Sequence, residues 1–193
     1  MTALLFGLPG VLMRPRTEAD RRLIERTVGG DERIWPIYHD LRPAYDSGDV
    51  SDERFWRQLQ VRADLAPFDI MEAIAADHET VLVADEEMRT VVTELVDADR
   101  CCGILANLPC SLAKLVRAEH PWIERVDAVT FSCDIGVAAP DPRAFAVAVD
   151  ALGVHARDTV FLDTDPAHLA AATDAGLRAV PFTGPDSVRE VLT

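Results

Sequence analysis

The chain has 193 residues, 49% of them hydrophobic, and a formal net charge of −14 at pH 7. A chain of this length suits one domain with a modest insertion, and its core is large enough to fold without a disulfide or a metal. The acidic balance argues against nucleic acids and anionic membranes as partners, because both bind basic surfaces. The four cysteines show no C-x-x-C spacing and are expected to be buried, reduced thiols.

Five short segments have the sequence pattern of strands in a buried parallel sheet, because they are apolar on both faces and rich in Val, Leu, Ile and Phe. They comprise residues 3–6, 101–106, 128–131, 159–163 and 178–182. Helical patterns separate the later segments, and Gly153 and Gly176 stand where two helices are expected to end. This alternation predicts an α/β fold, with a doubly wound parallel sheet and right-handed crossovers.

Residues 17–84 break the alternation, because apolar residues recur at helical spacing along the whole stretch. We therefore divide the chain into an α/β core domain, residues 1–16 and 85–193, and a helical domain inserted after the first strand, residues 17–84. Within the insertion, Ser51 is expected to cap a helix at its N-terminus. Pro43 is expected to kink or end a helix at the preceding residue, because it lacks the N–H that a helix needs.

The first apolar segment and the turn behind it read Ala3-Leu-Leu-Phe-Gly-Leu-Pro-Gly-Val-Leu12. This resembles the first motif of the haloacid dehalogenase-like (HAD) hydrolases, an apolar strand followed by Asp-x-Asp-Gly, then Val or Thr, then Leu. In that family the first Asp is the nucleophile and the second is the general acid and base. Gly7 and Pro9 stand at those two places, so the frame of the motif is kept without its reacting side chains.

Two later segments resemble the second and third motifs of the same family. Ile104-Leu-Ala-Asn-Leu-Pro109 has the form of a strand that ends in a Ser or Thr hydroxyl, and Ala106 stands at that place. In the other segment Ala139 precedes Pro-Asp-Pro, where the family has a lysine. In the family, the hydroxyl and the lysine hold the transferring phosphoryl group and balance its charge.

The segment Val160-Phe-Leu-Asp-Thr-Asp-Pro166 resembles the fourth motif, which carries a pair of acids. Asp163 is retained and is expected to hydrogen-bond loop backbone, whereas Thr164 replaces the second acid. The family's Mg²⁺ binds between this pair, the nucleophile and a backbone carbonyl, which Pro9 still has. One carboxylate and one carbonyl are a poor site for an ion that demands octahedral oxygen, so we expect no bound metal and no cofactor.

The resemblance extends over nearly the whole chain, with all four motifs in the family's order. It implies a Rossmann-like parallel sheet flanked by helices, with the first strand at its centre and the insertion as the family's small helical cap. It also implies that the nucleophile, the acid/base, the phosphate-binding hydroxyl and the lysine are absent, which leaves Asp163 as the one retained acid.

Three interpretations of function follow. The chain is an inactive HAD homologue that binds a small molecule or a protein partner, an inactive subunit of an oligomer such as a homodimer, or a phosphatase-type hydrolase with relocated residues, for which Asp163 and Asp165 are candidates. Loss of a whole catalytic unit favours inactivity, because a single lost residue is more readily compensated. The apolar N-terminus is too short to span a bilayer and lacks a basic n-region, so a cytoplasmic location is expected.

A binding cleft between the insertion and the sheet is expected to persist, because the strand ends of an open α/β sheet form a crevice whatever residues line it. The residues expected to line it lie in the four motifs and are Gly7, Pro9, Ala106, Asn107, Asp163 and Asp165. Since Gly7, Ala106 and Ala139 are small and non-polar, this cleft favours a neutral or apolar ligand over a phosphorylated one.

Other residues near the motifs have plainer expected roles. Lys114, Arg143 and His168 are expected on the surface, in water. Trp35 and Trp56 are expected on helices of the insertion, where they would report ligand binding by fluorescence if one of them faced the cleft.

Overall fold

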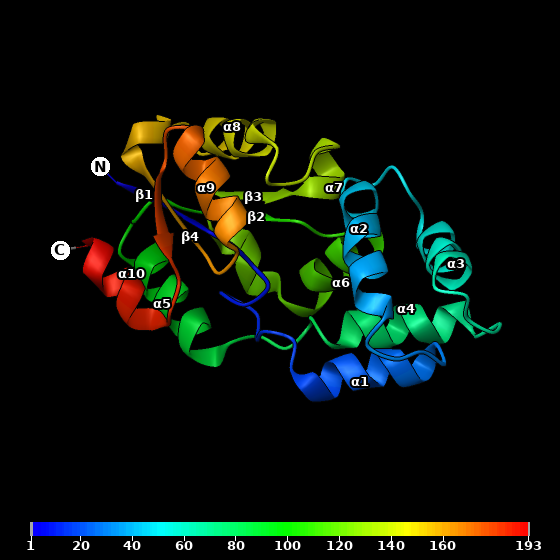
Figure 1. The fold of residues 1–193 in the computed structure, drawn as a ribbon. Coiled ribbons are helices and arrows are strands. Elements are labelled where there is room, and N and C mark those ends of the chain that lie inside the picture. Colours follow the sequence, from blue (N-terminus) through cyan, green and yellow to red (C-terminus); the bar gives the residue numbers. More distant parts are fainter. Residues whose placement is uncertain (1, 193) are drawn as a thin grey trace.

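The computed structural model describes residues 2–192 and contains a five-stranded parallel sheet (Figure 1). The strands are β1 (Ala3–Phe6), β2 (Cys102–Ala106), β3 (Ala128–Phe131), β4 (Thr159–Asp163) and β5 (Arg178–Pro181). Their order is β3-β2-β1-β4-β5, so β1 is central, as the motif resemblance implied. Leu4 pairs with Cys102 on one side and with Val160 on the other, and every residue of β1 is buried.

Helices cover both faces of the sheet, which confirms the predicted α/β fold. The helices on one face are α5 (Glu86–Asp97), α6 (Cys110–Glu119) and α10 (Pro185–Leu192), and those on the other are α8 (Pro142–Ala151) and α9 (Pro166–Asp174). The core divides accordingly, since Leu4 packs on the α5 side and Leu5 on the α8 side. Three short elements complete the core: α7 (Ser132–Ile135) and the 3₁₀ helices η1 (Pro121–Arg125) and η2 (Ala156–Asp158).

Four helices lie between β1 and α5 and form the cap (Figure 1). They are α1 (Glu18–Thr27), α2 (Ile34–Asp46), α3 (Asp52–Arg62) and α4 (Ile70–Glu79). The cap encloses an aromatic core of its own, in which Tyr45 stacks on Phe55 with ring centroids 4.2 Å apart. Trp35 and Trp56 are buried in this core and do not face the cleft described below, so neither probes a ligand there directly.

The cap enters and leaves the core through two segments that lie side by side. Met13 and Ala84 form an antiparallel bridge between them, and the Arg14 N–H donates to the Val83 carbonyl at 2.7 Å. These two segments are termed the hinge and comprise residues 12–16 and 80–85. The two ends of the cap are therefore joined to one another as well as to the core.

Two predictions within the cap have different outcomes. Ser51 caps α3 as expected, because its side chain accepts a hydrogen bond from the Arg54 N–H at 3.3 Å. Pro43, in contrast, lies inside α2, which continues beyond it, so the prediction of a helix end is wrong. Tyr38 and Tyr45, on either side of Pro43, are both buried in the cap core, and this packing outweighs the lost hydrogen bond.

The cysteines are all free but are less buried than predicted. Cys102 is buried, Cys101 and Cys133 are partly buried, and Cys110 is exposed. Cys101 and Cys102 pack on opposite faces of the sheet, as their adjacent positions imply.

Candidate functional site

A cleft of about 580 Å³ lies between the cap and the carboxyl ends of the strands. Its core side is built by the segments around the ends of β1, β2 and β4, which contribute Pro9, Asn107 and Asp163. Its cap side includes Tyr38 and Arg42 of α2. Parallel strands end at the same edge of a sheet, so motifs that are far apart in the sequence meet here.

Gly7 lies beneath the Asp163 side chain. A Cβ atom at residue 7 would be 2.7 Å from Oδ2 of Asp163 and 3.0 Å from its Cγ, closer than real Cβ atoms approach such groups. Only glycine leaves room for the carboxylate in this position. A side chain at residue 7 would therefore require the Asp163 carboxylate to move.

Both carboxylate oxygens of Asp163 have partners. Oδ1 accepts a hydrogen bond from the Asp165 N–H at 2.9 Å, and Oδ2 lies 3.2 Å from Nδ1 of His168. Asp163 is buried, whereas the Asp165 side chain is half-exposed and caps α9 by accepting from the Ala167 N–H. Asp163 thus holds loop backbone, as expected from the sequence, and in addition positions an imidazole ring.

The prediction that His168 lies on the surface is wrong. Its side chain is 20% exposed and lines the cleft, with Nε2 at 3.4 Å from Nδ2 of Asn107. Burial alone would lower the pKa of His168, but the nearby carboxylates, Asp163 foremost, outweigh burial and raise it. The sequence signal that points to this place is the position of His168 in the first turn of α9, directly after β4, where side chains reach the strand ends.

Asn107 occupies the part of the site where the family has its hydroxyl and its lysine. Its Nδ2 donates to the Ala139 carbonyl at 2.7 Å, and its Oδ1 accepts from the Ala139 N–H at 2.9 Å. Ala106 and Ala139 also line the cleft. The Asn107 amide is therefore engaged with backbone, and neither alanine offers a polar side chain to a ligand.

The expectation of a weakly polar cleft is wrong, because three arginines line it. Arg14 and Arg16 come from the hinge, and Arg42 comes from α2. Nη2 of Arg14 lies 3.3 Å from Asp20, while its Nε is buried without a hydrogen-bond partner. These residues lie outside the four motifs, which is why sequence reasoning missed them, although Arg14-Pro-Arg16 directly follows the first motif.

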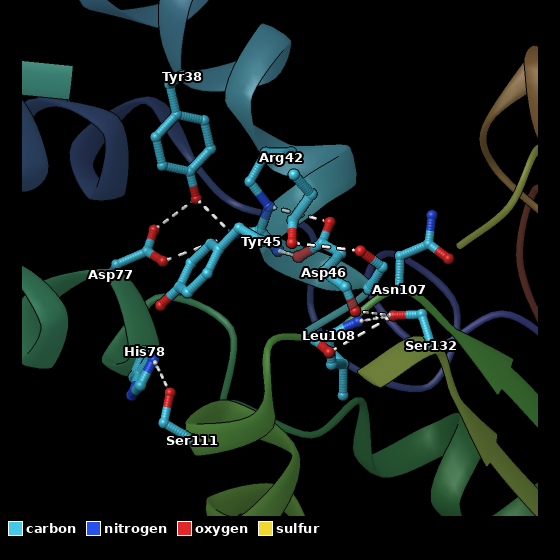
Figure 2. A network of polar contacts seen from close by, with 12 residues as sticks. Tyr38, Arg42, Tyr45, Asp46, Asp77, His78, Asn107, Leu108, Ser111 and Ser132 are labelled. Carbon is cyan, nitrogen blue, oxygen red and sulfur yellow. Dashed lines mark hydrogen bonds and ion pairs between the residues drawn. The ribbon is translucent and has the colours of Figure 1, made fainter. Parts of the chain in front are cut away.

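Arg42 and Tyr38 meet Asp77 in a buried polar network beside the cleft (Figure 2). The Tyr38 hydroxyl donates to Oδ1 of Asp77 at 2.7 Å and accepts from Nη1 of Arg42 at 2.9 Å. Arg42 also pairs with Asp46, with Nη2 at 2.5 Å from Oδ1. Arg16 adds a third contact from the hinge, with Nη2 at 2.8 Å from Oδ1 of Asp77. Since Asp77 is fully buried, the guanidinium groups supply the opposite charge that its carboxylate requires.

Two serines of the core contact the cap, and Figure 2 shows Ser132 beside Asp46 and Ser111 beside His78. The Ser132 hydroxyl accepts from the Leu108 N–H at 2.9 Å and donates to the Asp46 carbonyl at 2.5 Å. The Ser111 hydroxyl donates to Oδ1 of Asp52 at 2.6 Å. The cap is thus fixed to the core at the end of α2 and at the start of α3.

The remaining cations considered from the sequence lie away from the cleft. Lys114 is exposed on α6, and Arg143 is exposed beside Asp141, with Nη2 at 2.7 Å from Oδ2. Neither belongs to the cleft wall. They therefore do not replace the family's lysine at Ala139.

The residues present do not fit Mg²⁺. Gly7 supplies no side-chain oxygen, Thr164 offers a hydroxyl in place of a carboxylate, and both oxygens of Asp163 already have partners. His168 also competes with a metal ion for the Asp163 carboxylate. Within residues 2–192, no group of three or more His, Cys, Asp or Glu side chains is arranged to hold a metal ion.

Several solved structures have the same architecture. A HAD family enzyme from Bacteroides thetaiotaomicron superposes with a TM-score of 0.82 at 15% identity, over 100% of this chain and 98% of that one. A predicted HAD-like family hydrolase from Porphyromonas gingivalis gives 0.77 at 18% identity, over 100% and 98%. The chain has the HAD fold. An L-2-haloacid dehalogenase gives 0.69 at 20% identity, over 93% of this chain and 85% of that one.

One structure of the Bacteroides enzyme is a complex with magnesium and inorganic phosphate, at a TM-score of 0.80 and 15% identity. No family model matches the chain, and no curated protein matches it. Among the helices of residues 2–192, none is long and apolar enough to cross a membrane.

Proposed function

We propose that this HAD-fold protein is a binding protein without magnesium-dependent phosphatase activity, and that its cleft holds a small polar ligand with an anionic group. The observation that carries the proposal is the placement of Asp163 over Gly7, with His168 at 3.2 Å from its carboxylate. The retained acid uses its oxygens to hold a loop and an imidazole, and residue 7, where the family has its nucleophile, carries no side chain.

The catalytic side chains absent from the four motifs serve successive steps of one reaction, so their absence at several places makes phosphatase activity less accessible than any single loss would. HAD phosphatases form an aspartyl-phosphate, and Gly7 has no atom to form it. Pro9 cannot transfer a proton, a step that typically contributes 10²–10⁴-fold to rate. Ala106 and Ala139 cannot stabilise charge on a transferring group. Removing the members of one catalytic unit does not reduce activity additively, so restoring a single one of them is expected to restore little.

The anionic preference follows from the cations of the cleft. The whole chain carries a net charge of −14, yet the lining of the cleft balances four groups that carry positive charge when protonated, Arg14, Arg16, Arg42 and His168, against three acids, Asp46, Asp163 and Asp165. The charges of Arg16 and Arg42 are balanced by Asp77 and Asp46, whereas Arg14 has a single ion pair through Nη2. Arg14 is therefore the cation with most capacity left for a ligand, and a planar carboxylate or a phosphate matches a guanidinium group.

Binding is tested with two probes, inorganic phosphate and citrate, by calorimetry and by the thermal unfolding midpoint. A ligand at 100 times its Kd stabilises the native state by about 2.7 kcal/mol. We expect at least one probe to raise the midpoint of the wild type, the Arg14→Gln variant to lose that rise, and the matched Arg143→Gln variant to keep it. The same rise in both variants, or none in the wild type, would rule out the anionic ligand.

Catalysis is tested separately on the same protein. With a generic phosphate monoester and millimolar Mg²⁺, we expect turnover no greater than that of a buffer blank, for the wild type and for Gly7→Asp. Magnesium-dependent turnover by the wild type that disappears in Asp163→Asn would overturn this half of the proposal.

A second candidate function rests on the contact between Asp163 and His168. An imidazole held by a carboxylate through Nδ1 can take a proton from water at Nε2, as in hydrolases that use a histidine base, and in His168 that atom has a 3.4 Å contact with Nδ2 of Asn107 to give up. This candidate predicts metal-independent hydrolysis of an ester that His168→Gln abolishes and Arg143→Gln leaves intact. The binding proposal predicts no hydrolysis in any of these variants.

A further inference from the structure

Cys110 and Cys133 come together at the joint between the core and the cap. Cys110 is the first residue of α6, and Cys133 lies in α7. Both lie against Gly48, in the turn between α2 and α3. A Cβ atom at residue 48 would be 3.3 Å from Sγ of Cys110 and 3.7 Å from Cα of Cys133, and Gly48 has a φ of +83°. Two segments of the core therefore meet at one point under the cap, each with a thiol.

The two thiols differ in their surroundings. Cys110 is exposed, so a dissolved oxidant reaches it first. Cys133 is partly buried, and burial raises the pKa of its thiol to about 12, with the Cys110 side chain and Asp134 adding to the effect. The raised pKa makes the Cys133 thiolate less abundant, so Cys133 is the slower of the two thiols to react with a dissolved oxidant.

Each cysteine is the chain neighbour of a serine that holds the cap. Ser111 follows Cys110 and donates to Asp52, and Ser132 precedes Cys133 and donates to the Asp46 carbonyl. A covalent bond between the two sulfur atoms would join the two core segments that carry these contacts. The pair is thus placed where a change in oxidation state alters how firmly the cap is held.

We propose that Cys110 and Cys133 form a reversible disulfide when the protein meets a peroxide, and that this bond tightens the attachment of the cap to the core. The Cys110 sulfur attacks one oxygen of the peroxide, the O–O bond breaks, and a sulfenic acid forms with release of water or an alcohol. The Cys133 sulfur then displaces the sulfenic hydroxyl as a second water, its proton leaving with that hydroxyl. Two electrons pass from the thiols to the peroxide, and a dithiol reductant reverses the change. The proposal is independent of what the cleft binds.

The disulfide is detected on the full-length protein treated with hydrogen peroxide. We expect the intact mass to fall by two hydrogen atoms, the number of titratable thiols under denaturing conditions to fall from the four of the reduced chain to two, and a tryptic map to link residues 110 and 133. Cys133→Ser should abolish the link, and the double variant Cys101→Ser/Cys102→Ser should keep it, because those two thiols lie at the opposite end of β2 from α6.

The effect on the cap is measured by hydrogen exchange of the oxidised and reduced protein. We expect slower exchange in the turn between α2 and α3 after oxidation, with no change in Cys133→Ser. Circular dichroism shows whether the Cys133→Ser variant has folded. If the variant has not folded, wild-type protein alkylated at Cys110 serves as the control that cannot form the disulfide. Oxidation of Cys110 to a sulfinic acid alone, a disulfide between two chains, or a 110–133 link that leaves exchange unchanged would each overturn the proposal.

Discussion

The Asp163 carboxylate lies directly over Gly7, where a Cβ atom would be 2.7 Å from Oδ2. A side chain at residue 7 would therefore displace the Asp163 carboxylate from the position in which it contacts Asp165 and His168. This contact predicts that the two positions are energetically coupled.

Gly7→Ala is expected to lower the free energy of unfolding by about 1–3 kcal/mol, because the added methyl group overlaps the carboxylate. Asp163→Ala removes that carboxylate, so the double variant should be more stable than the sum of the two single effects predicts. Urea unfolding of the four proteins measures the coupling. Additive effects would show that the overlap is relieved elsewhere.

His168 is expected to make stability depend on pH. Its pKa is raised in the folded protein, so the stabilisation it gives is fully present below its unfolded pKa, about 6.5, and is lost as the pH rises through the higher folded pKa. The stability difference between wild type and His168→Gln should therefore shrink from pH 6 towards alkaline pH. Urea unfolding at a series of pH values tests this, and a difference that grows with pH would contradict it.

Ser132→Ala is expected to lower stability by about 1–3 kcal/mol, because the Leu108 N–H and the Asp46 carbonyl are then left without their partner. The matched change Ser51→Ala removes the N-terminal capping hydrogen bond of α3, which lies within the cap domain, at a cost of about 1 kcal/mol. Hydrogen exchange separates the two variants. Faster exchange at the end of α2 should appear in Ser132→Ala, and its absence would show that Ser132 does not hold the cap.

Within the buried polar network, substitution of Asp77 should lower the free energy of unfolding more than substitution of Tyr38. Tyr38→Phe removes one hydrogen bond to Asp77 at a cost of about 1–3 kcal/mol. Asp77→Asn keeps the shape but removes the charge that faces Arg16 and Arg42, and breaking a buried pair in this way costs about 3–5 kcal/mol. Denaturant unfolding gives the order of the two effects, and a reversed order would show that the ion pairs of Asp77 contribute less to stability than its hydrogen bond with Tyr38.

The sheet was predictable because its signals are local. Three strands have the predicted bounds, residues 3–6, 128–131 and 159–163. Each of the other two strands is one residue shorter than predicted, at its start in β2 and at its end in β5. These segments are apolar on both faces, and a parallel sheet covered by helices is the arrangement that buries them. The position of β1 at the centre came from the resemblance of the motifs.

The chemistry of the cleft was less predictable because it depends on which segments meet in space. Arg14 and Arg16 follow a motif in which no arginine has a role, and Arg42 lies on a cap helix, so no local pattern placed them beside Asn107. His168 was misplaced for a related reason. The helix α9 is short and rich in alanine, so the spacing of its apolar residues does not show which side of it is buried. The contact between His168 and Asp163 does show which side faces the strand ends.

The pairing of the two hinge segments places cations of the cleft at the joint between the cap and the core. Met13 bridges Ala84, so the two connections form one paired joint instead of two separate tethers. Arg14 and Arg16 belong to this joint and line the cleft. An anion bound by either of them would therefore contact the joint itself as well as the cleft wall.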